Sequence, residues 1–73
     1  MIDCTDIKIA FGNRLRSLRK AKQLSQEKLA ELADSDRTYI SDVELGKRNI
    51  SMVNICKLAS ALEIEIKDFF NNL

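Results

Sequence analysis

The stretch from Leu24 to Asn49 constrains the fold more than any other part of the chain, because it predicts two short helices with clear ends. Ser25 is a good N-cap for the first helix, and Asp36 is the expected N-cap of the second, which we predict over 37–45. Gly46 then supplies the left-handed residue that ends the second helix. Two helices of about eight residues joined by so tight a turn cross steeply, and they leave one edge of the second helix exposed.

The composition favours helices along the whole chain. The 73 residues include no proline and only two glycines, and the good helix formers leucine, alanine, lysine, arginine and glutamate are plentiful. We expect one domain over residues 1–73, with residues 1–6 as a flexible tail. A domain of this size has a small core and is only marginally stable alone, so self-association would help to stabilise it.

Apolar residues at helical spacing predict the remaining helices. Phe11, Leu15 and Leu18 mark the inner face of a helix over 7–22. Ser51 is the expected cap of a fourth helix, and a short last helix is predicted over 66–71. The side chains predicted to point inward from the second, third and fourth helices are Leu29, Ala30, Ala33, Ile40, Val43, Met52, Ile55, Cys56, Ala59 and Leu62.

The sequence lacks the residues that several classes of function require. No apolar run is long enough to cross a membrane, and acidic residues stand where a signal peptide carries basic ones, so we expect a cytoplasmic protein. The absence of histidine disfavours a zinc site, and Cys4 and Cys56 are expected to be reduced thiols, with Cys56 in the core. Without histidine, a glycine-rich phosphate loop or an obvious carboxylate pair, an enzyme is disfavoured, and we expect no cofactor and no metal.

Positive charges are unevenly distributed, although the formal net charge is only +1. Six basic residues and no acidic residue lie between positions 8 and 22, and Lys47 and Arg48 form a second basic site. Basic faces on a nearly neutral chain are compatible with DNA contact. They are also compatible with ordinary solvated helix surfaces, which is the interpretation that we favour for Arg16, Lys20 and Lys22.

The residues of the two central helices resemble a known family. The segments LSQEKLAELA and DRTYIS, with the E-x-GKRN run of 44–49, look like the helix-turn-helix domain of phage-repressor/Cro type, the XRE family, over residues 8–70. DRTYIS and RNIS look most like the controller proteins of restriction–modification systems. The resemblance implies an all-α fold, a compact five-helix domain of the lambda-repressor type. It also implies an autoregulating transcription regulator, a homodimer on a palindromic operator in double-stranded DNA, with no small-molecule effector.

The resemblance further implies roles for individual residues. Arg37 would read a guanine, Gln26 would contact a phosphate, and Asp42 would accept a hydrogen bond from cytosine or repel phosphate. The positions expected to contact DNA are Gln26, Arg37, Thr38, Tyr39, Ser41, Asp42, Lys47, Arg48 and Asn49. Arg19 and Glu44 match a pair that forms a largely buried salt bridge in the family.

Other interpretations stay open. Taken singly, Arg37 could be a solvated arginine, Tyr39 could pack on the surface, and 47–48 could be a plain basic loop. A dimer interface is expected near the C-terminus, with one of the two phenylalanines folding back onto the core, and its residues are Ile66, Phe69, Phe70 and Leu73. The alternative function is that of a protein-interaction module, an antitoxin-like or anti-repressor-type helix-turn-helix protein whose main partner is another protein. The low net charge and the acidic residues around 37–45 favour it slightly.

Several residues depart from the family pattern. Ser35 replaces the usual apolar residue of the turn, which weakens the seal between the two helices, and Asp42 stands where many relatives have a basic or amide residue. Asp34 and Glu63 stand where the family usually has glycine, and Glu65 stands where a short capping residue is usual. Aspartate tolerates left-handed backbone better than most residues, so we expect the turn at Asp34 to form at some cost in stability. Glu63 and Glu65 weaken the prediction of the last helix.

Overall fold

A computed structural model describes residues 4–71 of the chain, with side chains from residue 6 onward, and all regular structure in this part is helical. Four α-helices, α1 (Cys4–Ala21), α2 (Gln26–Leu32), α3 (Arg37–Glu44) and α4 (Met52–Leu62), precede a 3₁₀ helix, η1 (Ile66–Phe70). The all-α prediction is confirmed, but the fifth element is a 3₁₀ helix rather than a fifth α-helix.

Residues 4–6, which were expected to belong to a flexible tail, form the first turn of α1. Asp6 lies in that turn, where its negative charge suits the positive end of the helix dipole. Neither proline nor glycine interrupts the chain there. Residues 1–3, the rest of the predicted tail, lie outside the described residues, and so does Leu73.

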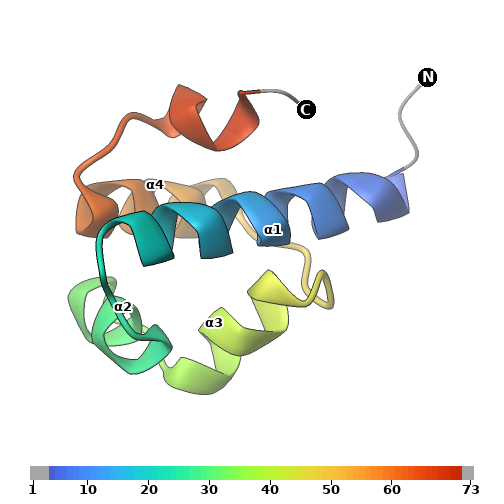
Figure 1. Cartoon of the computed structure of the whole chain (residues 1–73). Coiled ribbons are helices and arrows are strands. Elements are labelled where there is room, and N and C mark those ends of the chain that lie inside the picture. The colour runs from blue at the N-terminus through green and yellow to red at the C-terminus, as the bar shows by residue number, and fades with distance from the viewer. Residues whose placement is uncertain (1–3, 72–73) are drawn as a thin grey trace.

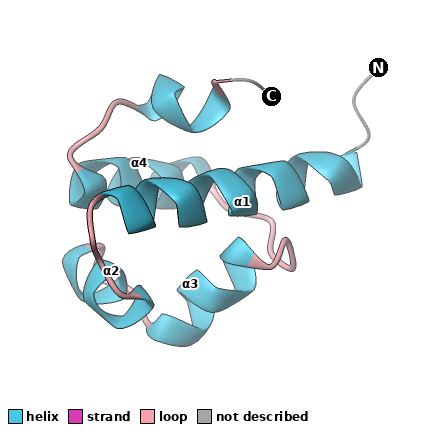
Figure 2. Ribbon diagram, viewed as in Figure 1, coloured by secondary structure: helices cyan, strands magenta, loops and turns pink. Residues whose placement is uncertain are grey.

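Figure 1 shows α1 running through the middle of the molecule, with α2 and α3 on one side of it and η1 on the other. In this view α4 lies behind α1, and Figure 2 shows that short loops join the helices. Every element contributes to the largest fully buried side chains, which are Phe69, Leu15, Leu29, Ile40, Leu58, Leu62 and Val43. One hydrophobic core therefore holds all five elements together.

Gly12 determines how closely α1 and α3 approach. A Cβ atom at this position would collide with the carbonyl oxygen of Val43 and would lie 2.7 Å from that of Glu44. A hydrogen atom in place of the side chain therefore lets the end of α3 pack directly on the backbone of α1.

Each α-helix ends at a residue with left-handed backbone, and these residues are Gln23 (φ 59°), Asp34 (φ 54°), Gly46 (φ 76°) and Glu63 (φ 57°). At the end of α2, the Ser35 N–H donates to the Ala30 carbonyl at 2.8 Å and the Asp34 N–H donates to the Glu31 carbonyl at 3.2 Å. These two bonds form a Schellman motif, which satisfies the last carbonyl groups of the helix. Three of the four left-handed residues carry a side chain, and each of these costs roughly 1–2 kcal/mol.

The inner face of α4 differs from the prediction. Met52 is 85% exposed and Cys56 is exposed as well, so neither is a core residue. Leu58 is buried instead, between the partly buried Ile55 and the buried Leu62, because positions at i, i+3 and i+7 share one face of a helix. The other predicted inward side chains are buried, namely Leu29, Ala30, Ala33, Ile40, Val43, Ala59 and Leu62.

Candidate nucleic-acid interface

Helices α2 and α3 form the predicted pair of short helices, and both begin at the predicted caps. Ser25 Oγ accepts a hydrogen bond from the Lys28 N–H at 2.9 Å. Asp36 Oδ1 accepts one from the Tyr39 N–H at 2.8 Å. Such caps satisfy N–H groups that the first turn of a helix cannot bond internally. Two local hydrogen bonds thus fix where each helix starts, with the left-handed Asp34 between them.

Helix α3 presents one polar edge to solvent. Arg37 and Thr38 are exposed at its start, and Ser41 and Asp42 are partly exposed one turn later. The opposite face packs into the molecule through Ile40, Val43 and Glu44. A helix held so firmly on one face keeps its exposed edge in a fixed orientation.

A buried ion pair connects α1 to α3. Arg19 Nε donates to Glu44 Oε2 at 2.6 Å, Arg19 Nη2 donates to Glu44 Oε1 at 3.0 Å, and both residues are 8% exposed. Arg19 Nη1 also donates to the Leu24 carbonyl at 2.8 Å. The amide Nε2 of Gln26, the first residue of α2, donates to Glu44 Oε1 at 3.1 Å. The ion pair expected from the sequence is therefore present, and it also orients the side chain of Gln26.

The loop after α3 folds back onto the exposed edge. Arg48 Nε lies 3.3 Å from Asp42 Oδ2, and the Arg48 guanidinium carbon lies 5.3 Å from the centroid of the Tyr39 ring. Lys47 and Asn49, on either side of Arg48, are exposed. The structure thus brings Tyr39, Asp42 and Arg48 together, so Asp42 has a basic partner within the protein.

Sequence reasoning missed Asn54 of α4. Its side-chain Nδ2 lies 3.0 Å from the Tyr39 hydroxyl oxygen, to which it donates a hydrogen bond. No local pattern pairs these residues, because their contact depends on how α3 packs beside the start of α4. Tyr39 is consequently held by two helices and is partly buried.

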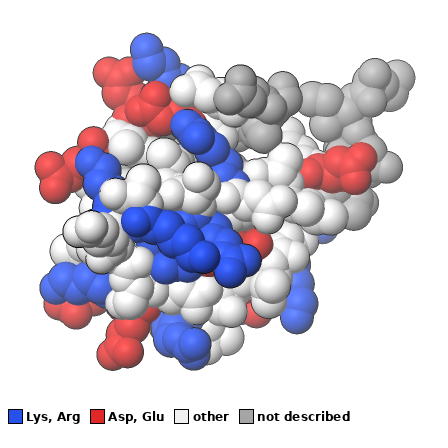
Figure 3. All heavy atoms as spheres, viewed as in Figure 1, with Lys and Arg blue, Asp and Glu red and all other residues white. Residues whose placement is uncertain are grey.

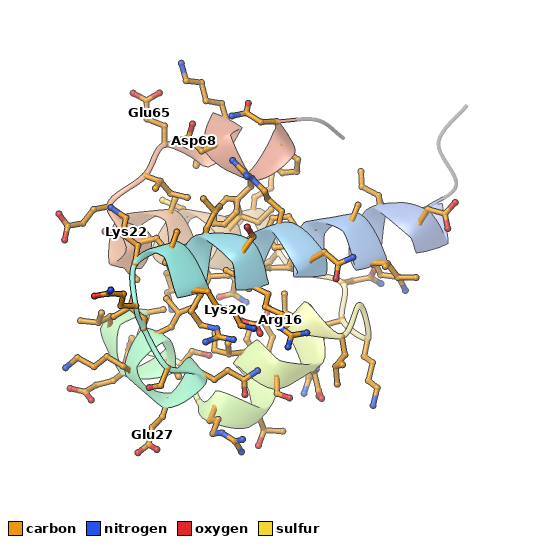
Figure 4. The ribbon with its side chains drawn as sticks, in the orientation of Figure 1. Arg16, Lys20, Lys22, Glu27, Glu65 and Asp68 are labelled. Atoms are coloured by element: carbon orange, nitrogen blue, oxygen red, sulfur yellow. The ribbon has the colours of Figure 1, made fainter. Side chains whose placement is uncertain are left out.

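A basic patch lies beside the helix pair. Figure 3 shows lysine and arginine side chains gathered at the centre of the visible face, and Figure 4 places Arg16 and Lys20 there, on the side of α1 where α2 and α3 lie. Within residues 6–71, the ion pairs include neither of these two side chains, and they include neither Arg37 nor Lys47. These four charges are therefore available to a negatively charged partner.

The residues expected at a dimer interface do not behave alike. Phe69 is completely buried, with its ring centroid 5.0 Å from that of Phe11, so it is the phenylalanine that folds back onto the core of the single copy. Phe70 and Ile66 are 41% and 47% exposed. An apolar hollow of about 240 Å³ is lined by Met52, Ile55, Ile66 and Phe70. The hydrogen bond from Arg14 Nε to the Asp68 carbonyl, 2.9 Å long, ties η1 to α1.

Among the side chains described, those of residues 6–71, no group of histidine, cysteine, aspartate and glutamate could hold a metal ion. No helix within residues 4–71 has the length and apolar character needed to span a membrane.

Known proteins are similar to this chain in sequence and in the arrangement of their helices. A family model described as Helix-turn-helix matches residues 15–69. The control protein C.MunI of a Mycoplasma species is 51% identical over 69 residues, which cover 93% of this chain and 93% of that protein. The control protein C.BamHI of Bacillus amyloliquefaciens is 46% identical over 67 residues, which cover 90% of this chain and 83% of that protein.

A solved structure of a controller protein also resembles this chain. The restriction–modification controller protein C.AhdI from Aeromonas hydrophila superimposes with a TM-score of 0.91 and 54% identity, covering 94% of this chain and 100% of that one. The chain therefore belongs to the helix-turn-helix family of DNA-binding transcription regulators of XRE type, and it is closely related to the control proteins of restriction–modification systems.

Proposed function

We propose that this chain is a sequence-specific transcription regulator that binds a two-fold operator in double-stranded DNA as a homodimer and controls its own restriction–modification system. The observation that carries this proposal is the exposed edge of α3, which starts at Arg37 and is held in place by the buried face behind it. The start of such a helix is the end that reaches base edges in the major groove. Similarity to C.MunI and C.AhdI over almost the whole chain supports the same function.

Arg37 is the proposed base-reading residue. Its guanidinium group offers a planar fork of donors that matches N7 and O6 of guanine. Within residues 6–71 no ion pair occupies this group. Thr38 and Ser41, further along the same edge, contact neighbouring base edges or sugars in this proposal.

Phosphate contacts flank the reading edge. Gln26 precedes α3 in the sequence, and its side chain is oriented by the 3.1 Å hydrogen bond to Glu44. The basic loop of 47–49 follows α3. Arg16 and Lys20 add two charges from α1 (Figure 4). Such contacts hold the protein in register on the duplex and release counterions, so they make binding dependent on salt.

Asp42 limits non-specific attraction. In the free protein its carboxylate holds Arg48 at 3.3 Å. On binding, Arg48 exchanges this partner for a phosphate, and the carboxylate either accepts from a cytosine amino group or repels the backbone. We therefore propose weak binding to arbitrary DNA, so that base contacts determine where the protein stays.

A second copy of the chain covers the hollow beside η1 in this proposal. The hollow is apolar, and Met52 at its edge is 85% exposed in the single copy. A weak dimer makes control steep, because operator occupancy then depends on the square of the monomer concentration. A controller of this kind activates its promoter at low occupancy and represses it at high occupancy.

The test is equilibrium binding to the DNA upstream of the protein's own gene and to a scrambled duplex, at several salt concentrations. We expect salt-sensitive binding that favours the upstream DNA. Arg37→Ala should lose about 1–3 kcal/mol of this preference, because it removes a base contact. Arg48→Ala should weaken both complexes and reduce the salt slope by about one, because it removes a phosphate contact. Equal binding of both duplexes by the unaltered protein would contradict the proposal.

A further inference from the structure

Tyr39 is anchored from three directions. Its backbone N–H is bound by Asp36 Oδ1 at 2.8 Å, and its hydroxyl accepts a hydrogen bond from Asn54 Nδ2 at 3.0 Å. The Arg48 guanidinium group lies 5.3 Å from the ring centroid, within cation–π range. A tyrosine at the edge of a short helix would otherwise move between side-chain rotamers. The Asp36 cap fixes the backbone, and the contacts to the hydroxyl and the ring select one side-chain orientation before any partner arrives.

Asp36 is the N-cap of α3 and Arg48 lies in the loop after α3, so Asn54 is the one of these three anchors that comes from another helix. Asn54 belongs to α4, and its own backbone N–H is fixed by the Ser51 cap at 3.1 Å. Both Asn54 and Tyr39 are partly buried, which strengthens a hydrogen bond relative to one made in open water. The first turn of α4 is therefore held by its cap, and the Asn54 side chain on that turn holds the tyrosine hydroxyl against α4.

We infer that Asn54 is a positioning residue for sequence selectivity, acting through the Tyr39 hydroxyl and not through contact with DNA. This inference rests on the proposed function. A ring held in one rotamer presents the same edge to each base step, and the entropy of ordering it is lost on folding rather than on binding. The affinity for DNA with complementary base steps then rises relative to the affinity for other DNA, while contacts to phosphates stay unchanged.

Asn54 lies on the same helix as Met52, a residue of the apolar hollow. It lies two residues after Met52 in the first turns of α4, and Met52 lines the apolar hollow proposed for the second copy. The helix that anchors the reading tyrosine is thus the helix proposed to carry the contact between the two copies.

The experiment uses the whole chain and compares Asn54→Ala, Tyr39→Phe and the double variant. For each protein, binding to the upstream DNA and to a scrambled duplex is measured, together with the melting temperature. We expect Asn54→Ala to lower the selectivity ratio by roughly three- to tenfold, the loss typical of one hydrogen bond, with binding to scrambled DNA unchanged. Tyr39→Phe should have a similar effect. The double variant should be no worse than Tyr39→Phe, because the two residues act through one bond.

Ser60→Ala, an exposed truncation on the same helix, is the matched control and should leave selectivity unchanged. An Asn54→Ala protein as selective as the unaltered one would overturn the inference alone. Losses that multiply in the double variant would overturn it too, because Asn54 would then act independently of the hydroxyl. If the unaltered protein bound both duplexes equally, the proposed function and this inference would fail together.

Discussion

Glu44 is buried in the molecule, and it also orients Gln26, a residue of the proposed interface. Its carboxylate is shared by Arg19 and Gln26, and Arg19 also binds the carbonyl of Leu24 in the loop between α1 and α2. In the described part of the chain, every buried side-chain nitrogen and oxygen has a hydrogen-bond partner. Such complete pairing offsets the cost of removing two charges from water. One residue thereby sets α1, α2 and α3 relative to one another.

Glu44→Ala should therefore destabilise the fold strongly. Removing the carboxylate leaves the Arg19 charge buried without its partner, which costs about 3–5 kcal/mol in comparable cases. The measurement is the free energy of unfolding from urea titration, supported by the melting temperature. The matched control is Glu31→Ala, which removes one partner of the exposed Lys28–Glu31 pair at 3.4 Å and should change stability little. Similar small losses in both variants would argue against a structural role for the buried pair.

At the scale of elements, the ends of the helices carry the strain in this fold. Gln23, Asp34 and Glu63 adopt left-handed backbone with a β-carbon in place, and Gly46 does so without one. These four turns keep the helices short and direct the chain back to the core. The fold tolerates the three strained residues because buried side chains on either side hold each turn closed.

Glu63→Gly should accordingly stabilise the protein. The substitution removes steric strain at a φ of 57°, and after the greater flexibility of glycine in the unfolded chain is subtracted the gain should be about 1 kcal/mol. Chemical denaturation measures it. The opposite change, Gly46→Ala, should destabilise, since its φ is 76° and a Cβ atom would lie 2.9 Å from Ile9 Cγ1. A loss of stability in Glu63→Gly would show that the strain argument is wrong.

Some features of the helices could be predicted from the sequence because they depend on interactions between residues close together in the chain. Others depend on packing between helices and could not be predicted. Ser25, Asp36 and Gly46 act on residues within one turn, so the start and end of the helix pair could be read from local sequence. The inner face of α4 could not, because its sequence allows two neighbouring apolar stripes and packing against the other helices buries Leu58 rather than Cys56.

Some features of the candidate site could likewise be predicted from local sequence, and others could not. The exposed edge of α3 follows from the helix period once Ile40 and Val43 are placed inside. The bonds from Asn54 to Tyr39 and from Arg48 to Asp42 do not, since each depends on where a loop or another helix packs. The 3₁₀ form of η1 is likewise absent from the apolar pattern, which Phe69 and Phe70 satisfy in either kind of helix.

At the scale of the whole molecule, a single copy has little with which to specify a site. Helix α3 has eight residues and is therefore about 12 Å long. It spans only about four base pairs at about 3.4 Å each. The formal net charge of +1 adds little long-range attraction. Two copies related by a two-fold axis double the base pairs that are read, which is why the proposed function depends on a dimer.

Selection of bound duplexes from a random DNA pool tests this account most directly, with the unaltered protein and Met52→Glu compared. Met52 is 85% exposed in the single copy, so the charge should disrupt association and leave the fold intact. We predict that the unaltered protein enriches two inverted copies of one short half-site at fixed spacing, and that Met52→Glu enriches sequences with a single copy, bound more weakly. No enrichment, or single half-sites selected by the unaltered protein, would contradict the account.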